Sequence, residues 1–153
     1  NKARLLIAKA HERLSNCRAD FQHKQSKAII DENQAVIVET LKVKNMLKNK
    51  KLSKHISDAS WYSFIQKLSY KAQEQGKHLI KIDQWYPSSK TCSECGYIVE
   101  KMPLQTRNWN CPECQASLDR DINASINIKN KGIEFLKAEG MSVSAVGGLC
   151  KSA

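Results

Sequence analysis

The chain has 153 residues, of which 25 are Lys or Arg and 15 are Asp or Glu, so its formal net charge is +10. This length suits one domain with a small insert, and the positive balance favours a polyanionic partner, most simply nucleic acid. No apolar run approaches the roughly 18 residues of a membrane span, and no signal peptide follows Asn1. We therefore expect a cytoplasmic protein with no membrane partner.

The first predicted element is a helix over residues 2 to about 29. Apolar residues recur there at steps of three and four and predict one buried stripe: Leu6, Ala10, Leu14, Cys17, Phe21 and Ala28. Cys17 is then a core residue. A short apolar run, residues 35–41, is rich in β-branched residues and interrupted by Glu39. We interpret it as a buried strand of a mostly parallel sheet.

The next segment, residues 42–54, is the densest basic run of the chain and contains no acid. Its basic residues are Lys42, Lys44, Lys48, Lys50, Lys51 and Lys54. Such a run is usually a solvated, mobile loop, but a mobile loop can also contact phosphates without reading bases. We treat the six lysines as candidate nucleic-acid contacts.

Two further helices and a second strand complete the predicted order. Ser57 and Asp58 are predicted to cap a helix that carries Trp61 and Leu68 on its apolar face and stops at Gly76. Residues 78–83 form the second strand. Asp119 or Asp121 is predicted to cap a last helix that runs to about residue 131 and ends at Gly132, and residues beyond about 140 are expected to be disordered. Alternating helices and strands favour an α/β fold.

Four cysteines lie between the second strand and the last helix, with the spacing C-x2-C-x15-C-x2-C: Cys92, Cys95, Cys111 and Cys114. This spacing is typical of a zinc site, and a site made only of thiolates has no open position, so the predicted Zn²⁺ is structural. Two short strands, residues 97–99 and 107–110, would form a ribbon. Disulfides are the alternative, disfavoured because Cys17 and Cys150 lie far away and no secretory signal is visible.

Three carboxylates occupy positions that suit a hard cation. Glu39 lies near the carboxyl end of a predicted strand, where ligand sites of α/β sheets gather, and Asp119 and Asp121 open the last helix. Two-metal phosphodiester hydrolysis needs several carboxylates around a pair of Mg²⁺ ions. The residues alone also allow plainer roles: helix caps for the two aspartates, and an ion pair with a lysine for Glu39.

Over roughly residues 35–128 the chain resembles the carboxyl-terminal part of the TnpB family, the OrfB proteins of bacterial insertion sequences. The motifs that carry the resemblance are Ile37-Val38-Glu39-Thr40-Leu41, Ile56-Ser57-Asp58-Ala59-Ser60-Trp61, Pro87-Ser88-Ser89-Lys90-Thr91-Cys92-Ser93-Glu94-Cys95-Gly96, Arg107-Asn108-Trp109-Asn110-Cys111-Pro112-Glu113-Cys114 and Asp119-Arg120-Asp121-Ile122-Asn123-Ala124-Ser125-Ile126-Asn127-Ile128. They occur in this order along the chain, and together they are highly specific.

The resemblance implies a RuvC-type nuclease with an RNase-H-like sheet, similar to the type V CRISPR effectors, that is guided by RNA and cleaves DNA with Mg²⁺. Glu39 matches the second catalytic carboxylate and Asp121 the third, with Asp119 a lesser candidate, and Arg107 matches a basic position that could face a phosphate. The implied division is a partial nuclease portion over residues 1–90, a zinc ribbon over 91–118, a final helix over 119–139 and a tail over 140–153.

One departure from the family pattern matters more than any of the matches. The family's first catalytic Asp lies on an early strand in a Gly-Ile-Asp-like context, and nothing here matches it, since Asp20 falls in the helical region and Asp31 in a turn. We expect the chain to begin after that strand and to lack cleavage activity alone. The alternative is a non-catalytic, nucleic-acid-binding zinc-ribbon fragment of a truncated or decayed gene. Gln115, where Gly often follows the second cysteine pair, is expected to cost little.

Overall fold

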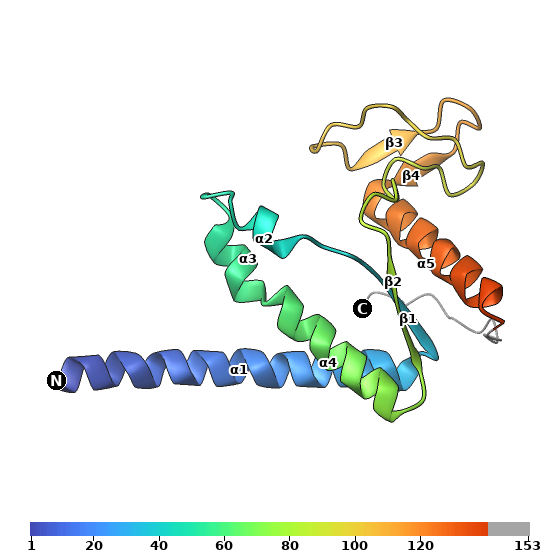
Figure 1. Ribbon diagram of the computed structural model, residues 1–153. Coiled ribbons are helices and arrows are strands. Elements are labelled where there is room, and N and C mark those ends of the chain that lie inside the picture. The colour runs from blue at the N-terminus through green and yellow to red at the C-terminus, as the bar shows by residue number, and fades with distance from the viewer. Residues whose placement is uncertain (141–153) are drawn as a thin grey trace. The chain divides into compact units, whose positions relative to one another are not determined.

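The computed structural model describes residues 1–140 and contains short sheets and longer helices (Figure 1). In chain order its elements are α1 (Lys2–Glu32), β1 (Ala35–Glu39), α2 (Val43–Met46), α3 (Ser53–Ala59), α4 (Trp61–Glu74), β2 (His78–Ile82), β3 (Asn108–Asn110), β4 (Ser117–Asp119) and α5 (Arg120–Ala138). The described chain divides into two compact units: residues 1–36 with 42–79, and residues 37–41 with 80–140. The expected α/β class is confirmed; the tail predicted to be disordered lies outside the described residues apart from its first residue.

In the first unit, α4 packs against the carboxyl-terminal part of α1. Ile30, Leu68 and Ala72 form the buried centre of this contact, and Phe64 and Leu79 pack around it. The 31 residues of α1 extend about 46 Å, whereas the 14 residues of α4 extend about 21 Å. α4 is therefore too short to cover the amino-terminal part of α1.

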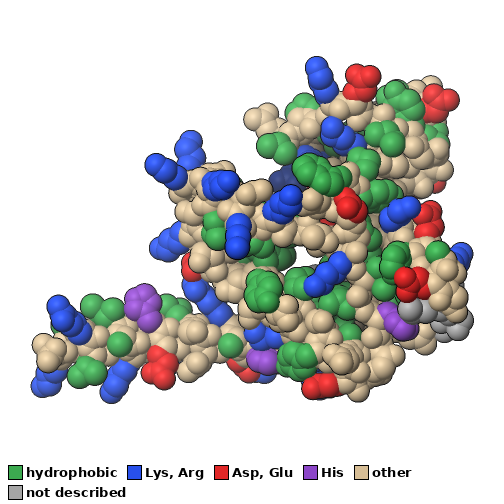
Figure 2. All heavy atoms as spheres, viewed as in Figure 1, with side chains coloured by type: hydrophobic (Ala, Val, Ile, Leu, Met, Phe, Trp, Pro, Cys, Tyr) green, Lys and Arg blue, Asp and Glu red, His purple; other side chains and the backbone are tan. Residues whose placement is uncertain are grey.

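The stripe predicted on α1 is wrong for this reason. Leu6, Leu14 and Phe21 are 67%, 53% and 63% exposed, and Cys17 is exposed as well. Apolar and basic side chains share the surface of the amino-terminal part of α1 in Figure 2. The residues that α1 does bury are Gln22, Ser26 and Ile30, which follow a different face of the helix. Periodicity identified the helix correctly but could not identify which face has a neighbour.

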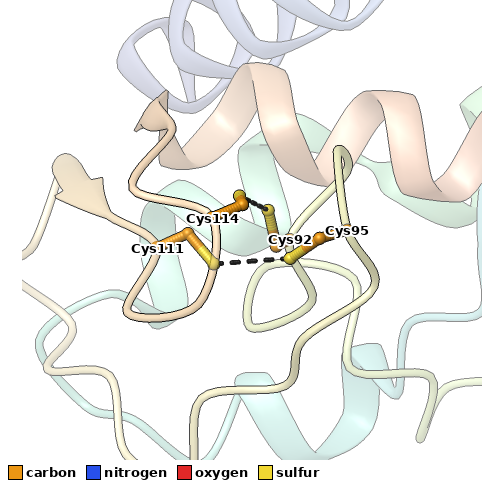
Figure 3. A group of neighbouring side chains, drawn as sticks. All are labelled: Cys92, Cys95, Cys111 and Cys114. Atoms are coloured by element: carbon orange, nitrogen blue, oxygen red, sulfur yellow. Dashed lines mark hydrogen bonds between the residues drawn. The ribbon is translucent and has the colours of Figure 1, made fainter.

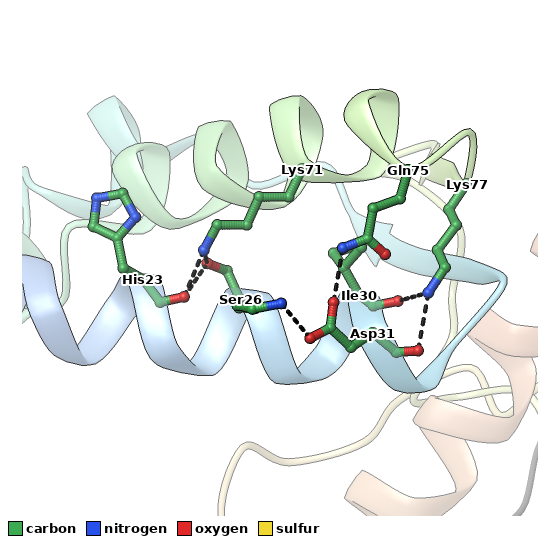
Figure 4. Close-up of polar contacts among 8 residues, drawn as sticks. His23, Ser26, Ile30, Asp31, Lys71, Gln75 and Lys77 are labelled. Carbon is green, nitrogen blue, oxygen red and sulfur yellow. Dashed lines mark hydrogen bonds and ion pairs between the residues drawn. The ribbon is translucent and has the colours of Figure 1, made fainter.

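Polar contacts from α4 and the residues just after it reinforce the end of α1 (Figure 4). The Nζ of Lys77 donates to the backbone oxygens of Ile30 and Asp31, and Lys71 Nζ donates to the backbone oxygen of His23. The carbonyl groups of the last helical turn have no partner within the helix, so Lys77 closes the end of α1 with a favourable charge. Burial, and then the neighbouring charges of Lys27 and Lys67, lower the pKa of Lys71.

Strands β1 and β2 pair in a two-stranded sheet. His78 N donates to Gln34 O at 3.0 Å where the strands begin, and Thr40 Oγ1 donates to Ile82 O at 2.8 Å where they end. The strands therefore run in parallel, as predicted, and α2, α3 and α4 form the crossover that a parallel pair requires. Both carboxyl ends lie at the same edge, so Glu39, the last residue of β1, lies there too.

The crossover begins differently from the prediction. The basic segment, residues 42–54, contains α2 and the first two residues of α3 where a loop was expected. Ser57 and Asp58 lie inside α3 and cap nothing; Ser60, with φ of 49°, separates α3 from α4. A left-handed residue ends one helix and lets the chain change direction before the next.

The last helix, α5, is longer than predicted. Asp119 is its N-cap: the Oδ1 atom accepts hydrogen bonds from Asp121 N and Ile122 N, both at 2.9 Å. Gly132 does not end the helix, because α5 continues to Ala138. Gly132 is buried, and a Cβ atom added to it would lie 2.4 Å from Ile37 Cγ1. The glycine lets β1 and α5 approach closely. In the sequence alone, a glycine with this packing role looks the same as one that ends a helix.

Candidate metal centre and carboxylate site

The four cysteines of the ribbon converge on one point, from two turns that are 15 residues apart in the chain (Figure 3). All four Sγ atoms lie within 4.8 Å of one another, with Cys92 3.7 Å from Cys114 and Cys95 3.6 Å from Cys111. A tetrahedron with metal–sulfur bonds of about 2.3 Å has edges of about 3.8 Å. The four thiols therefore fit one tetrahedral metal ion.

The two turns, or knuckles, have the same backbone hydrogen bonds. Cys92 N donates to Tyr97 O and Gly96 N to Cys92 O; in the second knuckle, Cys111 N donates to Ala116 O and Gln115 N to Cys111 O. Gly96 and Gln115 hold equivalent positions, with φ of 79° and 59°. This repeat brings each cysteine pair to the same side of its turn. Gln115 adopts the left-handed conformation that favours glycine.

The ribbon strands differ in part from those predicted. Residues 108–110 do form β3, within the expected range 107–110, but β3 pairs with β4, which was not predicted, and Trp109 faces Leu118 in this register. Residues 97–99 form no strand and contribute one bridge, between Thr91 and Ile98. Each knuckle is thus enclosed by its own short pairing, which joins the residues before it to those after it.

The thiols influence one another's ionisation. At Cys95, the backbone N–H of Tyr97 lowers the pKa, but burial and the other three thiols raise it to about 12. At Cys111, burial raises the pKa, but the backbone N–H groups of Cys114 and Glu113 and the nearby thiols lower it to about 7. Four thiolates this close together would repel one another, and a bound cation would offset that repulsion.

Disulfides do not account for this cluster. Cys92, Cys95, Cys111 and Cys114 are all free, and their closest sulfur separations far exceed the roughly 2.05 Å of a disulfide bond. Cys17, predicted to lie in the core, is exposed and also free. Cys150 lies outside the described residues.

Glu39 lies at the carboxyl end of β1, and its carboxylate is exposed. Its Oε1 accepts a 2.6 Å hydrogen bond from Ser88 Oγ, a side chain that is only 5% exposed. The next residue, Thr40, is fixed to β2 through Ile82 O. The backbone of Glu39 is thus held by the sheet and its carboxylate by a buried hydroxyl, while a carboxylate of this kind keeps further lone pairs for other partners.

The two aspartates at the start of α5 have different surroundings. Asp119 Oδ1 is engaged as the helix cap described above, whereas Asp121 is exposed and its Oδ2 lies 3.2 Å from Arg107 Nη1. Both members of this ion pair are highly exposed, 70% and 75% for their side chains, so the pair contributes little to stability. Asp121 is consequently available to a cation, and Arg107 contacts a carboxylate here.

Among residues 1–140, the cysteine group is the one set of three or more potential ligands that gathers closely enough to hold a metal. Glu39, Asp119 and Asp121 do not form a second such set. Asp20 and Asp31 lie in α1 and pair with Lys24 and Lys27 at 2.7 and 2.6 Å.

The six lysines of the basic segment are all exposed. Figure 2 shows Lys and Arg side chains gathered on the surface over α2 and α3. The arrangement offers positive charge to a polyanion, whose phosphates would be contacted without base readout.

Sequence reasoning missed three residues that support the site: Ser88, Asn123 and Asn127. Asn123 and Asn127 are 1% and 5% exposed and lie four residues apart on α5, hence on one face. Two amides at that spacing among Ile and Ala residues could have indicated a buried polar contact. The sequence motif around these two amides points to the family but gives the amides no role of their own.

Two family models and several known relatives match most of this chain. Residues 61–128 match the family described as Cas12f1-like, TNB domain, and residues 1–50 match the family described as probable transposase, OrfB_IS605. A putative RNA-guided DNA endonuclease of Streptomyces pristinaespiralis is 46% identical over 132 residues, which cover 86% of this chain and 33% of the relative. The putative RNA-guided DNA endonuclease InsQ of Escherichia coli K12 is 26% identical over 146 residues, covering 86% of this chain and 36% of the relative.

A CRISPR-associated endodeoxyribonuclease, Cas12f1 of Sulfoacidibacillus thermotolerans, is 29% identical over 136 residues, covering 88% of this chain and 32% of the relative. A solved Cas12f1 chain, from a complex with single guide RNA and target DNA, has a TM-score of 0.62 and 21% identity over 84% of this chain and 39% of that one. This likeness shows a similar fold.

These matches place the chain in a family of insertion-sequence proteins. The particular family is TnpB/OrfB, as the motifs predicted. The chain spans about a third of the length of the curated relatives it matches. In residues 1–140, none of the helices combines the length and hydropathy needed to cross a membrane.

Proposed function

We propose that this chain is part of an RNA-guided DNA endonuclease of the RuvC type, in which Glu39 and Asp121 bind catalytic Mg²⁺. The observation that carries the proposal is the position of Glu39, at the carboxyl end of a parallel strand, in a chain 46% identical to a putative RNA-guided DNA endonuclease. The parallel pair β1–β2 would belong to an RNase-H-like sheet.

The proposed metal of the cysteine cluster is Zn²⁺, with a structural role. Four thiolates at tetrahedral spacing are a common zinc donor set and leave no position for a substrate or water. The cluster would hold the two knuckles together between β2 and α5. Zinc measured by mass spectrometry in the reduced, purified chain should approach one ion per chain, and its absence would contradict this assignment.

The proposed Mg²⁺ ligands are the carboxylates that remain accessible. Glu39 and Asp121 are both exposed and supply the hard oxygen ligands that Mg²⁺ requires. In two-metal hydrolysis the ions activate the attacking water and stabilise the leaving oxygen. Asp119 is the lesser candidate because one of its oxygens already caps α5. A third ligand, matching the family's first catalytic Asp, would come from outside this sequence.

The proposed partners are guide RNA and DNA. A net charge of +10 and the exposed lysines of residues 42–54 favour contact with phosphates. The relatives' names and the nucleic acids in the solved Cas12f1 complex point to the same partners.

The catalytic assignment is tested in the longer protein that contains this segment. Asp121→Ala and Glu39→Gln should each abolish Mg²⁺-dependent DNA cleavage and leave guide-RNA binding unchanged. Glu134→Gln, a change at an exposed carboxylate further along α5 that pairs with Lys131, is the matched control and should cleave normally. Cleavage retained by either active-site variant would end the assignment.

A second candidate is a zinc-ribbon module that binds nucleic acid by charge and does not cleave. The exposed lysines of residues 42–54 and the cysteine cluster favour it for the chain in isolation. The logarithm of its affinity should fall linearly with the logarithm of salt concentration. Mg²⁺-dependent cleavage by the 153-residue chain would exclude this candidate.

A further inference from the structure

A buried polar path connects the first knuckle to the carboxylate of Glu39, and it begins on α5. Asn123 Nδ2 donates to Thr91 O at 2.7 Å, and Asn123 Oδ1 accepts from Ser93 N at 2.8 Å. Thr91 and Ser93 are the two neighbours of Cys92. One side chain amide therefore fixes the backbone on both sides of a candidate metal ligand.

One turn further along α5, Asn127 continues the path. Its Nδ2 donates to Thr91 O at 2.6 Å and to Ser88 O at 2.8 Å. The backbone from Pro87 to Thr91 is itself closed into a turn, with Thr91 N and Lys90 N both 3.0 Å from Pro87 O. The position of Ser88 is thereby set by the same helix face that sets the position of Cys92.

Ser88 completes the path with the 2.6 Å hydrogen bond from its hydroxyl to Glu39 Oε1. Ser88, Asn123 and Asn127 are all at least 95% buried. Buried polar groups are costly unless they are paired, so each member of the path restricts the others to one arrangement. Nothing in Glu39's own strand fixes its carboxylate in this way.

We propose that Ser88 is a positioning residue for Glu39, and that the metal-binding knuckle orients this carboxylate through Asn123, Asn127 and Ser88. The inference rests on the proposed function, in which Glu39 binds Mg²⁺. Groups that hydrogen-bond to metal ligands fix their orientation, and their loss typically costs about 10–100-fold in metal affinity or activity. Ser88 occupies one lone pair of Oε1 and leaves the remaining lone pairs of the carboxylate for a cation.

The test follows the side-chain carboxyl ¹³C resonance of Glu39 in the zinc-loaded 153-residue chain. Ser88→Ala and Asn127→Leu should both shift it, and Ser88→Thr, which keeps the hydroxyl, should restore it. Ser125→Ala is the matched control, because that exposed hydroxyl bonds only within α5, to Ile122 O. An unmoved resonance in Ser88→Ala, or in an Asn127→Leu chain that retains zinc, would overturn the proposal.

The connection to the metal is tested by removing zinc with a chelator. The Glu39 resonance should move in the wild-type chain and stay unmoved in Ser88→Ala, because the path is already cut there. Equal movement in both chains would overturn the proposal.

Nuclease activity provides a separate readout. In the longer protein, Ser88→Ala should reduce Mg²⁺-dependent cleavage about 10–100-fold and Ser88→Thr should recover it. If Glu39→Gln leaves cleavage intact, the proposed function fails, whatever the resonances show. If Glu39→Gln abolishes cleavage but the resonances do not respond to Ser88→Ala, the positioning role alone fails.

Discussion

The helix pair α1–α4 and the cysteine ribbon hold distant parts of the chain together by opposite means. The helix pair buries apolar side chains such as Ile30 and Leu68, aided by lysines that reach backbone carbonyls. The ribbon contributes only two fully buried cysteines to the core and relies on four thiols and repeated backbone hydrogen bonds. The stability of the helix pair is distributed over many contacts. That of the ribbon would be concentrated in the proposed zinc site.

The largest expected effect of a single change is therefore at a cysteine. Cys92→Ser should abolish zinc binding and unfold the ribbon, because binding to such a site supplies about 10 kcal/mol or more of folding free energy. Amide hydrogen exchange should show lost protection in β3 and β4 and retained protection in α4. Cys17→Ser, at an exposed cysteine outside the cluster, is the control. If the β3 amides stay protected from exchange in Cys92→Ser, the stability of the ribbon does not depend on this cysteine.

The helix pair should respond to loss of packing. Leu68→Ala removes a 2% exposed side chain from its centre and should lower the free energy of unfolding by about 2–5 kcal/mol, measured by thermal melts of helical circular dichroism. Leu6→Ala, at a 67% exposed position of α1, should change stability by less than about 0.5 kcal/mol. Equal losses would mean that the amino-terminal part of α1 is covered in solution.

A smaller effect is expected where β1 meets α5. Gly132→Ala places a methyl group against Ile37 and should cost about 1–3 kcal/mol, as overpacking does. In an Ile37→Ala background the same change should cost less, because the opposing side chain is gone. A double-mutant cycle measures this coupling, and additive losses would argue against the contact.

The smallest effect is a pH dependence at the end of α1. Hydrogen bonds from Lys27 and then Gln75 lower the pKa of Asp31 below its ordinary value of 3.8. A depressed carboxyl pKa stabilises the fold above the unfolded value and loses that contribution as the pH falls through the folded value. Thermal stability should therefore decline below about pH 4 slightly more in the wild-type chain than in Asp31→Asn. If the wild-type and Asp31→Asn chains lose stability in parallel as the pH falls, Asp31 does not cause the loss.

Local patterns in the sequence predicted what depends on local geometry. The cysteine spacing identified the cluster because two intervening residues suffice to close each knuckle. β-branched residues identified β1 and β2 within two residues at each end. Asp119 is one of the two predicted caps, and its side-chain oxygen accepts a hydrogen bond from the amide of Asp121, as an N-cap does.

Features that depend on a distant neighbour could not be read in this way. The buried face of α1 depends on where α4 packs against it, and the role of Gly132 depends on Ile37. Within α5, Asn123 and Gly132 lie about two and a half turns apart, so the helix buries two different faces along its length. A single apolar stripe describes neither of these two buried faces. The role of Ser88 can be inferred only from the structure, because it depends on the hydrogen bond to Glu39.

The contact between Ile37 and Gly132 also has a consequence for the order of folding. The two residues are separated by most of the chain, whereas the cysteine knuckles close within a short segment. Closing a short loop costs less conformational entropy than closing a long one, so we expect the knuckles to form before β1 docks on α5. During synthesis, β1 would emerge early and wait for α5. Pulse-labelled hydrogen exchange during refolding should protect Cys111 and Gln115 amides before those of β1.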